Sequence, residues 1–592
     1  MKDPQTILEV FLRRVKKEPK TIAFKQKEND VWKSTTWEEY QEIVRSLAAS
    51  LKDLGVQKGD RVAILSATRC EWALSDVAIL SLGAATVPIY PSNTASECEY
   101  VLSNSGTKIV IVEDEAQYNK IKNLNILQKI ICFNDFKRDP VLSWKNLVKE
   151  GRQKKFDIEA SIKTIESSQM ATIVYTSGTT GNPKGVVLTH DNFVSECLDI
   201  QRAFPLSHED VSLTFLPFAH IFARVEHLSS LVTGWCLAYA ESIEKVALNM
   251  GEVKPTLLFS VPRIYEKVHT KILAKVESGS FLKKEIFNWA VKVGSEVSSL
   301  LEKKRDISPL LKFQYQLAQK LVFNKIKQTF GGRIKFLISG GAPLAKELAR
   351  FFHAAGLLIV EGYGLTETTA AAFGNLPTHY HFGTVGLPLG EVQVKISEED
   401  GYPQGEGEIL IKSRKVFKEY YKNPQATKEV FINGWFATGD IGRIEENGSL
   451  RITDRKKDII VTSSGKNVAP QNIENYLKSD PYISQVMVYG DKRNYLTALV
   501  TLNREEIEKF AHQKRIIYGD WFELVASEDV RELIQEIISE KNKTLSSYQT
   551  IKKFKILEQD FSIESGELTP TLKVKRKYCN EKYKNILDSM YH

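Results

Sequence analysis

A chain of 592 residues exceeds the size at which a single hydrophobic core keeps growing, so we expect two or more domains. With 42% hydrophobic and 26% charged residues, the composition excludes a disordered chain and is that of an ordinary globular protein. The net charge of +8 arises in residues 265–335, where 15 Lys+Arg stand against 6 Asp+Glu. Since no nucleic-acid motif accompanies this stretch, we expect no nucleic-acid binding. An anionic membrane surface, an acidic partner and a merely solvated helical face stay open as its explanation.

The cysteines indicate a protein from a reducing compartment, and the apolar segments do not predict a membrane-spanning helix. Six cysteines, Cys70, Cys98, Cys132, Cys197, Cys236 and Cys579, occur without a CxxC pair, so neither disulfides nor a zinc site are expected. The first 20 residues hold no continuous apolar stretch, so no secretory signal is expected. The best apolar run, Val77–Tyr90, is shorter than the about 20 residues that a spanning helix needs. We expect a soluble cytoplasmic protein, with peripheral membrane contact left open.

Short apolar segments in the first part of the chain alternate between strand and helix patterns. Arg61–Leu65 and Ala85–Tyr90 predict strands, and Glu71–Leu82 between them predicts a helix. Lys108–Val112 and Lys129–Phe133 predict further strands at the same spacing. Such alternation indicates a parallel sheet covered by helices. No GxGxxG follows the first strand, so the dinucleotide-binding form of this fold is not supported.

A second series of this kind follows, and the chain then changes character. Its predicted strands are Val211–Leu216, Thr256–Ser260, Ile334–Ile338 and Leu357–Val360. From Gly383 to Thr453, turn signals at Asp400-Gly401, Asn433-Gly434 and Asn447-Gly448 indicate antiparallel β-structure. The charged segment Asp454–Asp458 leads into a mixed tail. We therefore expect an α/β fold: a large domain at 1–453 with two α/β subdomains and a β-rich, barrel-like subdomain, and a small α+β domain at 454–592.

The strand Ala171–Tyr175 runs into a loop of small, hydroxyl and cationic residues, Thr176–Gly185. Its glycines let the backbone approach phosphate oxygens, its hydroxyls donate hydrogen bonds, and Lys184 adds a mobile positive charge. The Walker pattern GxxxxGK[ST] is not met, because Pro183 replaces the second glycine and the Mg²⁺-binding hydroxyl is missing. We predict a different phosphate-binding loop that takes its metal ligand from elsewhere in the chain.

Five motifs in the same order resemble the adenylate-forming superfamily of acyl-CoA synthetases, luciferases and peptide-synthetase adenylation domains. They are YTSGTTGNPKG at Tyr175–Gly185, EGYGLTE at Glu361–Glu367, GWFATGD at Gly434–Asp440, DRKKDIIVTSSGKNVAP at Asp454–Pro470 and LTPTLKVKR at Leu568–Arg576. The resemblance covers nearly the whole chain. It implies ATP, Mg²⁺ and coenzyme A as reactants or cofactors, with coenzyme A a substrate.

The resemblance also implies which residues form the nucleotide site. Glu367 is the expected Mg²⁺ ligand, a hard carboxylate oxygen. Thr366 is expected at the α-phosphate and Tyr363 at adenine. Asp440 is expected at the ribose hydroxyls, which an acceptor-only carboxylate suits, with Arg455 as the second ribose contact. The remaining nucleotide-site residues expected are Thr176, Ser177, Gly178, Thr179, Thr180, Gly181, Lys184, Gly341, Ala342, Glu361 and Gly362.

The last two motifs imply which residues belong to a small domain that moves between the two half-reactions. Lys573 resembles the catalytic lysine that bridges the carboxylate and the α-phosphate, with Lys575 as the alternative in the same run. Lys457 falls where the family places a hinge, so the small domain is expected to be mobile between two half-reactions. Gly465 resembles the glycine that lets the pantetheine thiol pass, although a simple hairpin turn predicts the same residue.

Further segments resemble the long-chain fatty acyl-CoA synthetases. These are VPRIYEK at Val261–Lys267, SGGAPL at Ser339–Leu344 and the basic, helical insertion Val268–Arg333 between them. His220 falls at the family's aromatic position in the acyl pocket, although a buried structural histidine is the other interpretation. At Leu321–Phe323 and Ile326, apolar residues at helical spacing can face a core or a membrane. Glu419 departs from the family, where glycine commonly precedes the tyrosine pair, and puts the local geometry in doubt.

The sequence therefore predicts an AMP-forming ligase that joins a medium- to long-chain fatty acid to coenzyme A. Its expected partners are fatty acid, ATP and coenzyme A, and a homodimer stays open. An enzyme that loads the acyl group onto a carrier protein is one alternative. A non-catalytic scaffold is another, which the set Lys184, Glu367, Asp440, Arg455 and Lys573 opposes. The preferred chain length depends on where an apolar tunnel ends, which one sequence does not show.

Overall fold

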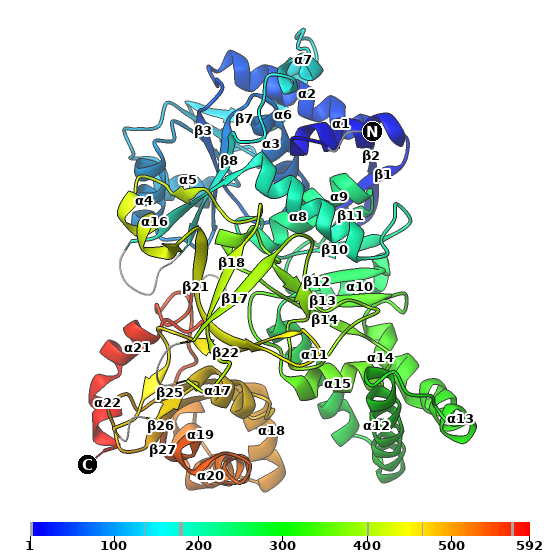
Figure 1. Cartoon of the computed structure of the whole chain (residues 1–592), viewed down its shortest axis with the longest axis vertical. Helices are drawn as coiled ribbons and strands as arrows, with labels where there is room; N and C mark the ends of the chain where they lie inside the picture. The colour runs from blue at the N-terminus through cyan, green and yellow to red at the C-terminus, as the bar shows by residue number, and fades with distance from the viewer. Residues whose placement is uncertain are drawn as a thin grey trace.

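The structure is a computed structural model that describes residues 4–136, 138–176, 182–398, 402–463, 466–569 and 573–591. Figure 1 shows a large N-terminal part above and a smaller part, drawn mainly in orange to red, at the lower left. The first helix, α1 (Ile7–Lys17), lies at the top of that view near the N-terminus. The predicted α/β fold with a separate C-terminal part is confirmed.

The first sheet has eight strands in the order β19-β9-β8-β4-β3-β5-β6-β7. Their bounds are β3 Arg61–Leu65, β4 Ala85–Ile89, β5 Ile109–Val112, β6 Lys129–Cys132, β7 Val141–Ser143, β8 Met170–Thr176, β9 Lys184–Thr189 and β19 Glu419–Tyr420. The strands from β4 to β7 are parallel and apolar on both faces, because helices cover both sides. Those helices are α2 (Trp37–Asp53), α3 (Cys70–Ser81), α4 (Ala95–Ser105), α5 (Glu115–Ile121), α6 (Trp144–Gly151) and α7 (Ile158–Ile162). The strands and the helix predicted in this region are confirmed.

The second sheet has nine strands in the order β16-β15-β14-β13-β12-β10-β11-β1-β2. Their bounds are β1 Ile22–Glu28, β2 Val31–Thr36, β10 Val211–Thr214, β11 Cys236–Tyr239, β12 Leu257–Ser260, β13 Phe336–Ser339, β14 Ile359–Tyr363, β15 Phe373–Gly374 and β16 Leu387–Pro388. The helices of this unit are α8 (His190–Ala203), α9 (Ile221–Thr233), α10 (Val246–Val253) and α15 (Lys346–Ala354). The four strands predicted here are confirmed. The sequence did not predict that the hairpin β1–β2 would join this sheet.

The segment after β16 is antiparallel, as its turn signals predicted. Its five strands are β17 Gln393–Glu398, β18 Gly407–Lys412, β20 Phe431–Ile432, β21 Trp435–Ile444 and β22 Leu450–Arg455, with α16 (Pro424–Val430) before β20. Asn433 and Gly434 form the turn between β20 and β21 with φ of 50° and 79°. Positive φ at both residues is what a tight hairpin turn requires. The turn signal at Asp400-Gly401 lies outside the described residues.

The basic insertion is helical. It consists of α11 (Pro262–Glu277), α12 (Phe281–Glu302), α13 (Pro309–Ala318), the π-helical turn η1 (Gln319–Phe323) and α14 (Asn324–Thr329). Figure 1 shows α12 and α13 projecting at the lower right, away from the sheets. Phe323 and Ile326 are buried, whereas Leu321 is exposed, so this apolar group divides between the core and the surface.

The C-terminal part has a hydrophobic core of its own. Its sheet, β25-β26-β27, spans Ile483–Tyr489, Leu496–Leu502 and Ile551–Ile556, and a two-stranded hairpin joins β23 (Ile460–Val461) to β24 (Asn467–Val468). Its helices are α17 (Pro470–Lys478), α18 (Arg504–Lys514), α19 (Trp521–Ala526), α20 (Glu528–Asn542), α21 (Arg576–Lys582) and α22 (Lys584–Ser589). Leu477, Val486, Val500 and Ile534 are among the residues that pack this core.

A buried ion pair joins the two large sheets. Arg224 on α9 donates from Nε and Nη2 to the two carboxylate oxygens of Asp76 on α3, at 3.0 and 2.6 Å. Both side chains are fully buried, and the rings of Trp72 and Phe193 lie against the guanidinium group. Thr86 on β4 donates to the same carboxylate at 2.6 Å. The charges are therefore satisfied without water.

The structure shows whether the cysteines are paired and whether any described helix could cross a membrane. All six cysteines are free and buried, which agrees with the prediction that none forms a disulfide. In the part of the chain that the structure describes, no helix is long and apolar enough to cross a membrane.

Asp76→Ala is expected to destabilise the large domain by about 3–5 kcal/mol, because it leaves the Arg224 charge buried without a partner. Denaturant unfolding followed by tryptophan fluorescence measures this change. The matched control is Asp53→Ala, which breaks an exposed pair with Lys154 and should cost less than about 1 kcal/mol. The double variant Asp76→Leu, Arg224→Met should recover most of the loss. Equal losses for Asp76→Ala and Asp53→Ala would contradict the assignment.

Candidate active site

One cavity of about 1510 Å³ lies between the large N-terminal part and the C-terminal part. Residues from both parts line it. Every predicted site residue that the structure describes is among them: Thr176, Lys184, His220, Gly341, Ala342, Glu361, Gly362, Tyr363, Thr366, Glu367, Asp440, Arg455, Lys457 and Lys573. The predictions at Ser177, Gly178, Thr179, Thr180, Gly181 and Gly465 lie outside the described residues. The cavity thus unites motifs that are nearly 400 residues apart in the chain.

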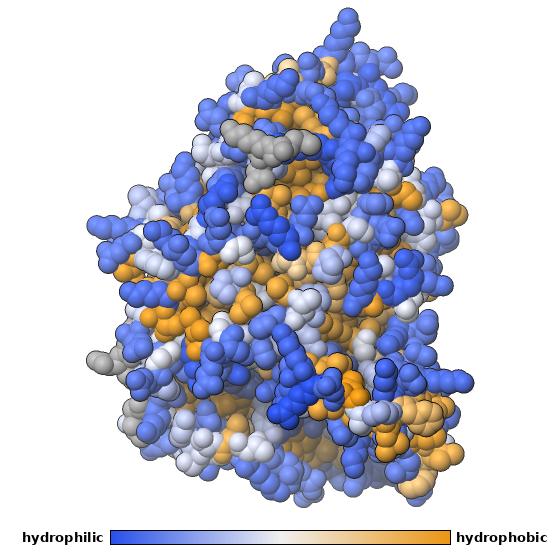
Figure 2. All heavy atoms as spheres, turned by 45° about the vertical axis from the view of Figure 1, so that its right-hand side comes forward, coloured by the Kyte–Doolittle hydropathy of each residue, from blue (hydrophilic) through white to orange (hydrophobic). Residues whose placement is uncertain are grey.

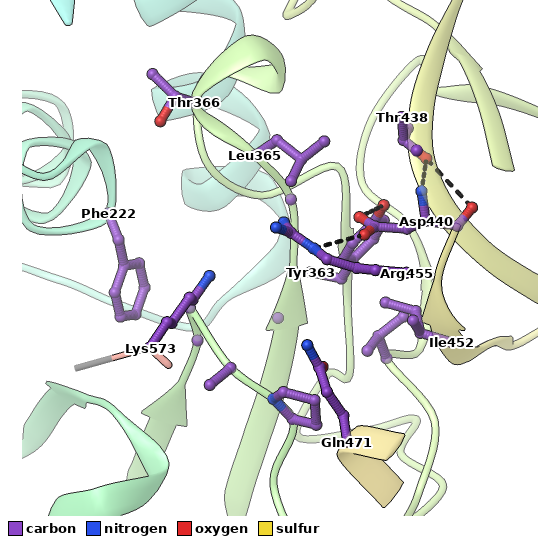
Figure 3. A pocket seen from close by; sticks show the side chains of 18 of the residues that line it. Phe222, Tyr363, Leu365, Thr366, Thr438, Asp440, Ile452, Arg455, Gln471 and Lys573 are labelled. Atoms are coloured by element: carbon purple, nitrogen blue, oxygen red, sulfur yellow. Dashed lines mark hydrogen bonds and ion pairs between the residues drawn. The ribbon is translucent and has the colours of Figure 1, made fainter. Parts of the chain in front are cut away.

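A hydrogen-bonded triad forms one end of the cavity. Asp440 on β21 and Arg455 on β22 face each other across the antiparallel pair. The Tyr363 hydroxyl donates to Oδ2 of Asp440 at 2.7 Å, and Nε of Arg455 donates to Oδ1 at 3.0 Å. Figure 3 shows the three side chains converging there, with Thr438 accepting from the backbone N–H of Asp440 at 3.1 Å. The Asp440 charge holds the pKa of Arg455 above its usual value. Both carboxylate oxygens keep lone pairs for further donors.

The turn after β14 presents Thr366 and Glu367 to the cavity. Gly364 is required there, because a Cβ at this position would collide with the backbone carbonyl of Ala370. Thr369 and Ala370 adopt positive φ of 55° and 83°, a conformation that non-glycine residues rarely take. The Thr368 hydroxyl accepts from the backbone N–H of Leu365 at 2.8 Å and closes the turn. Strain of this kind is typical of functional sites.

Tyr420 connects the Glu367 carboxylate to Lys184. Its hydroxyl donates to Oε1 of Glu367 at 2.8 Å, and Nζ of Lys184 lies 4.9 Å from the centre of its ring. Strand β19, which carries Tyr420, pairs with β9, which begins at Lys184. Glu419 on the same strand points to solvent, so the departure from the family noted at this position leaves the site geometry intact.

Glu367 is suited to a divalent cation. Burial raises the pKa of its carboxyl group, and none of the ion pairs among the described residues includes it. The described residues contain no cluster of three or more metal-ligating side chains. Mg²⁺ is commonly bound this way, by one or two carboxylates together with water and phosphate oxygens.

An apolar arm of the cavity lies between α8 and α9. Glu196 and Ile200 are four residues apart and share one face of α8, and Phe204 follows directly after the end of that helix. The arm is otherwise lined by apolar side chains of α9 and the second sheet: Ile221, Phe222, Val225, Phe259, Ile338 and Val360. Phe204 stacks on Phe336, with ring centres 5.5 Å apart. This arm can accept a long apolar group but few polar ones.

His220 stands where the arm meets the charged part of the cavity. Its Nδ1 accepts from the backbone N–H of Phe222 at 3.2 Å, so the ring caps α9 and carries its proton on Nε2. Burial, with the charge of Lys573 as a second cause, lowers the pKa of His220 to about 4. His220 thus lines the cavity and also caps a helix, and its place in an acyl pocket stays a prediction. Glu361 nearby accepts from the backbone N–H of Leu344 at 3.0 Å, and burial raises its pKa to about 7.

Lys573 enters the cavity from the C-terminal part. In Figure 3 it lies beside Phe222, and its amine points toward the space in front of the triad. The side chain keeps exposed surface because it projects into the open cavity, yet the surrounding protein lowers its pKa to about 8, with the charge of Arg455 adding to that effect. Arg576, three residues later, instead forms a bidentate pair with Glu474 at 2.8 and 2.9 Å. All four cations of the run, Lys573, Lys575, Arg576 and Lys577, line the cavity, and the pair with Glu474 fixes Arg576 at the start of α21.

Sequence patterns missed two residues that this geometry makes prominent. Tyr420 was noted only as a neighbour of the unusual Glu419, although an aromatic pair next to a motif strand was a usable signal. Phe222 forms the wall against which Gly340 packs, where an added Cβ would lie 3.1 Å from the ring. Its only signal was the repeated aromatic pattern Phe215, Phe218 and Phe222, which predicts a core as readily as a site.

Comparisons with known proteins agree with this geometry. The family model of the AMP-binding enzymes matches residues 11–421, and the model of the AMP-binding enzyme C-terminal domain matches residues 457–592. The long-chain-fatty-acid–CoA ligase FadD15 of Mycobacterium bovis is 34% identical over 583 residues, which cover 97% of this chain and 95% of that protein.

Solved structures share the fold at lower identity. The adenylation domain of the carboxylate reductase from Mycobacterium chelonae has a TM-score of 0.79 and 22% identity, with 99% of this chain and 91% of that one covered. O-succinylbenzoate coenzyme A synthetase from Bacillus subtilis, in complex with ATP and magnesium ion, has a TM-score of 0.68 and 22% identity, with coverages of 96% and 98%. The two family matches, and the similarity to the Mycobacterium bovis ligase over nearly the full length of both proteins, show that the chain belongs to the AMP-binding enzymes.

Proposed function

We propose that this chain is an AMP-forming ligase that joins a medium- to long-chain fatty acid to coenzyme A. The acid and ATP form an acyl-adenylate and pyrophosphate, and the thiol of coenzyme A then takes the acyl group and releases AMP. The observation that carries the proposal is the single cavity in which a polar end, with Tyr363, Asp440 and Arg455, and an apolar arm meet at Lys573. A fatty acid and ATP would react where the two halves join.

The polar end would hold the nucleotide. Tyr363 would face adenine, and the carboxylate of Asp440 would accept from the ribose hydroxyls while Arg455 holds that carboxylate in place. Lys184 and Thr366 would contact the phosphates. Glu367 would hold Mg²⁺, which supplies positive charge to the phosphate oxygens when it is bound. The synthetase from Bacillus subtilis, whose structure contains ATP and magnesium ion, supports this assignment.

Lys573 would bring two anions together. In the first half-reaction a carboxylate oxygen bonds to the α-phosphorus and the bond to pyrophosphate breaks, so no proton is transferred at that step. The barrier lies in orienting two negatively charged groups, and a cation between them lowers it. His220 is neutral, so it would shape the acyl entrance without adding a second positive charge.

The second half-reaction would use a different position of the C-terminal domain. We place the domain boundary at Asp454, giving domains at 1–453 and 454–592, with Lys457 as the hinge. In the structure Lys573 occupies the cavity, which suits adenylation. Rotation about the hinge would withdraw Lys573 and bring the segment at Gly465 toward the adenylate, where the thiol would attack the acyl carbonyl and AMP would leave.

The apolar arm and the relatives together indicate the acid. Apart from Glu196, the arm's lining on α8, α9 and the sheet is hydrophobic. The full-length relative at 34% identity is a long-chain-fatty-acid–CoA ligase. Delivery to a carrier protein is the second candidate, because an adenylation domain of a carboxylate reductase shares the fold.

An acid panel tests the activity directly. With acids from acetate to long-chain fatty acids, AMP release that needs coenzyme A should be greatest for medium or long chains, because each buried methylene adds about 0.8 kcal/mol of binding. Acid-dependent ATP–pyrophosphate exchange should follow the same order. No exchange with any fatty acid would refute the proposal, and AMP release only in the presence of a carrier protein would support the second candidate.

Lys573→Ala should separate the half-reactions. Adenylate formation should fall by about 100-fold or more, the loss expected when one group that stabilises the transition-state charge is removed. Thioester formation from supplied acyl-adenylate and coenzyme A should change little. Lys575→Ala is the matched control, and it should leave both steps near the wild-type rates. A larger loss from Lys575→Ala would move the assignment, and equal loss of both steps in folded Lys573→Ala would contradict it.

Tyr420→Phe should weaken the metal site without removing it. The variant loses the hydrogen bond that orients Glu367 but keeps the ring beside Lys184. The Mg²⁺ concentration that gives half-maximal pyrophosphate exchange should rise about 10-fold, as for other residues that orient a metal ligand. Tyr421→Phe is the control, because that hydroxyl lies 3.4 Å from the carbonyl of Ser105 and away from Glu367. Equal Mg²⁺ requirements for both variants would show that Tyr420 does not orient the ligand.

A further inference from the structure

The helices α12 and α13 carry a hydrophobic surface that no described part of the chain covers. We call it the hairpin surface, and its residues are Phe281, Leu282, Leu310, Phe313, Leu317 and Leu321. Phe281, Leu310 and Phe313 are 79%, 68% and 65% exposed. Figure 2 shows hydrophobic side chains gathered at the lower right, at the height of these helices. Single exposed apolar residues are ordinary, but several large ones on two packed helices indicate a surface for interaction.

The apolar residues of α13 and η1 form a continuous stripe. Leu310, Phe313, Leu317 and Leu321 follow one another at intervals of three or four residues, so they occupy one face. A neighbouring face, with Leu311 and Ala318, is buried against the rest of the fold, as is Phe323 in η1. Between the stripe and α12 lies a shallow apolar groove formed by Ile286 and Trp289 with Leu317 and Leu321. The helix therefore packs one apolar face against the core and exposes a second apolar face that can contact another surface.

Exposed cations surround this stripe. Residues 281–330 contain 10 Lys+Arg and 4 Asp+Glu, and Glu302 among the acidic residues is already paired with Arg350. Within the described chain, eight of the cations are exposed and form no ion pair: Lys283, Lys292, Lys303, Lys304, Arg305, Lys312, Lys320 and Lys325. An apolar stripe bordered by lysines is the composition of helices that lie at the boundary between lipid headgroups and acyl chains.

We propose that the hairpin surface docks the enzyme on an anionic lipid bilayer, with the stripe entering the headgroup region and the lysines contacting the lipid charges. A second copy of the chain fits this surface poorly, because a two-fold interface would place the two basic patches against each other. Each Lys or Arg near an anionic leaflet adds attraction, and the apolar stripe adds burial that salt does not screen. None of the hairpin-surface residues lines the cavity, so this inference does not depend on which acid the enzyme activates.

Vesicle sedimentation of the full-length protein tests the proposal. Wild-type protein should bind vesicles of phosphatidylcholine with phosphatidylglycerol at low salt, and bind those of phosphatidylcholine alone much more weakly. The variant Phe313→Ser, Leu317→Ser should bind anionic vesicles at least about 10-fold more weakly, from the buried apolar area it loses. The variant Lys303→Gln, Lys304→Gln, Arg305→Gln should lose about 10- to 100-fold, and about 1 M salt should mimic it.

Matched controls lie elsewhere on the surface. Ile517→Ser removes an apolar side chain that is 96% exposed on the C-terminal part. Lys145→Gln, Lys149→Gln, Lys155→Gln removes three exposed cations in and just after α6, on the first sheet's side. Both should bind vesicles like wild type. All variants should keep wild-type ATP–pyrophosphate exchange in detergent-free solution, which shows that they are folded and separates this test from that of the proposed function.

Three outcomes would overturn the proposal. The first is that the wild-type protein does not bind anionic vesicles at low salt, and the second is that the control variants weaken binding as much as the hairpin variants do. The third is that the wild-type protein is a dimer in sedimentation velocity, and that Phe313→Ser, Leu317→Ser converts it to a monomer while vesicle binding is unchanged. The last result would assign the surface to a second copy of the chain. Selective loss of binding in the two hairpin variants, without loss of exchange activity, would establish the docking surface.

Discussion

The ion pair between Asp440 and Arg455 links the polar end of the cavity to the C-terminal part. It spans neighbouring strands, and Arg455 is the last residue of β22. The position of Asp440 thus depends on the pairing of β21 with β22. Arg455 also lowers the pKa of Lys573, while Asp440 acts on it in the opposite direction. The charge states of the residues from the two parts are therefore coupled across the cavity.

This coupling favours anionic substrates. Lys184, Arg455 and Lys573 face one cavity, where burial and then repulsion from the Arg455 charge lower the pKa of Lys573. The carboxyl groups of Glu361 and Glu367 have raised pKa values because they are buried, so they compensate those cations only in part. Phosphates and a substrate carboxylate would relieve the repulsion. Fixed charges that need no rearrangement when charge develops are an effective way to stabilise a transition state.

Sequence patterns predicted the short buried strands well, because each is a run of β-branched and apolar residues between turn signals. Arg61–Leu65 and Asn433-Gly434 are examples in which local chemistry alone decides the outcome. The described motif residues that sequence patterns singled out all line one cavity, although they are far apart in the chain. The hairpin β1–β2 was not predicted to join the second sheet, because its pairing with β11 connects residues over 200 positions apart.

The same limit explains the residues that sequence patterns missed. Tyr420 matters because β19 adds to the first sheet beside β9, which places its hydroxyl on Glu367. The Arg224–Asp76 pair likewise joins two helices from different sheets. The tyrosine pair was visible in the sequence, but neither contact could be predicted from it, since the partner of each side chain lies far away in the chain. Only the topology of the sheets brings these partners together.

The chain uses positive charge in two physically different ways. In the cavity Lys573 and Arg455 are enclosed by protein, where screening by salt is weak and a neighbouring charge alters the pKa. Within the described residues, the unpaired lysines on α12 and α13 are exposed to solvent, where salt screens their charge, so their attraction to an anionic surface falls steeply with ionic strength. The stretch 265–335 carries the net charge of the whole chain, and the rest of the sequence taken together is close to neutral. The excess positive charge is therefore available for a surface interaction without changing the electrostatic balance of the site.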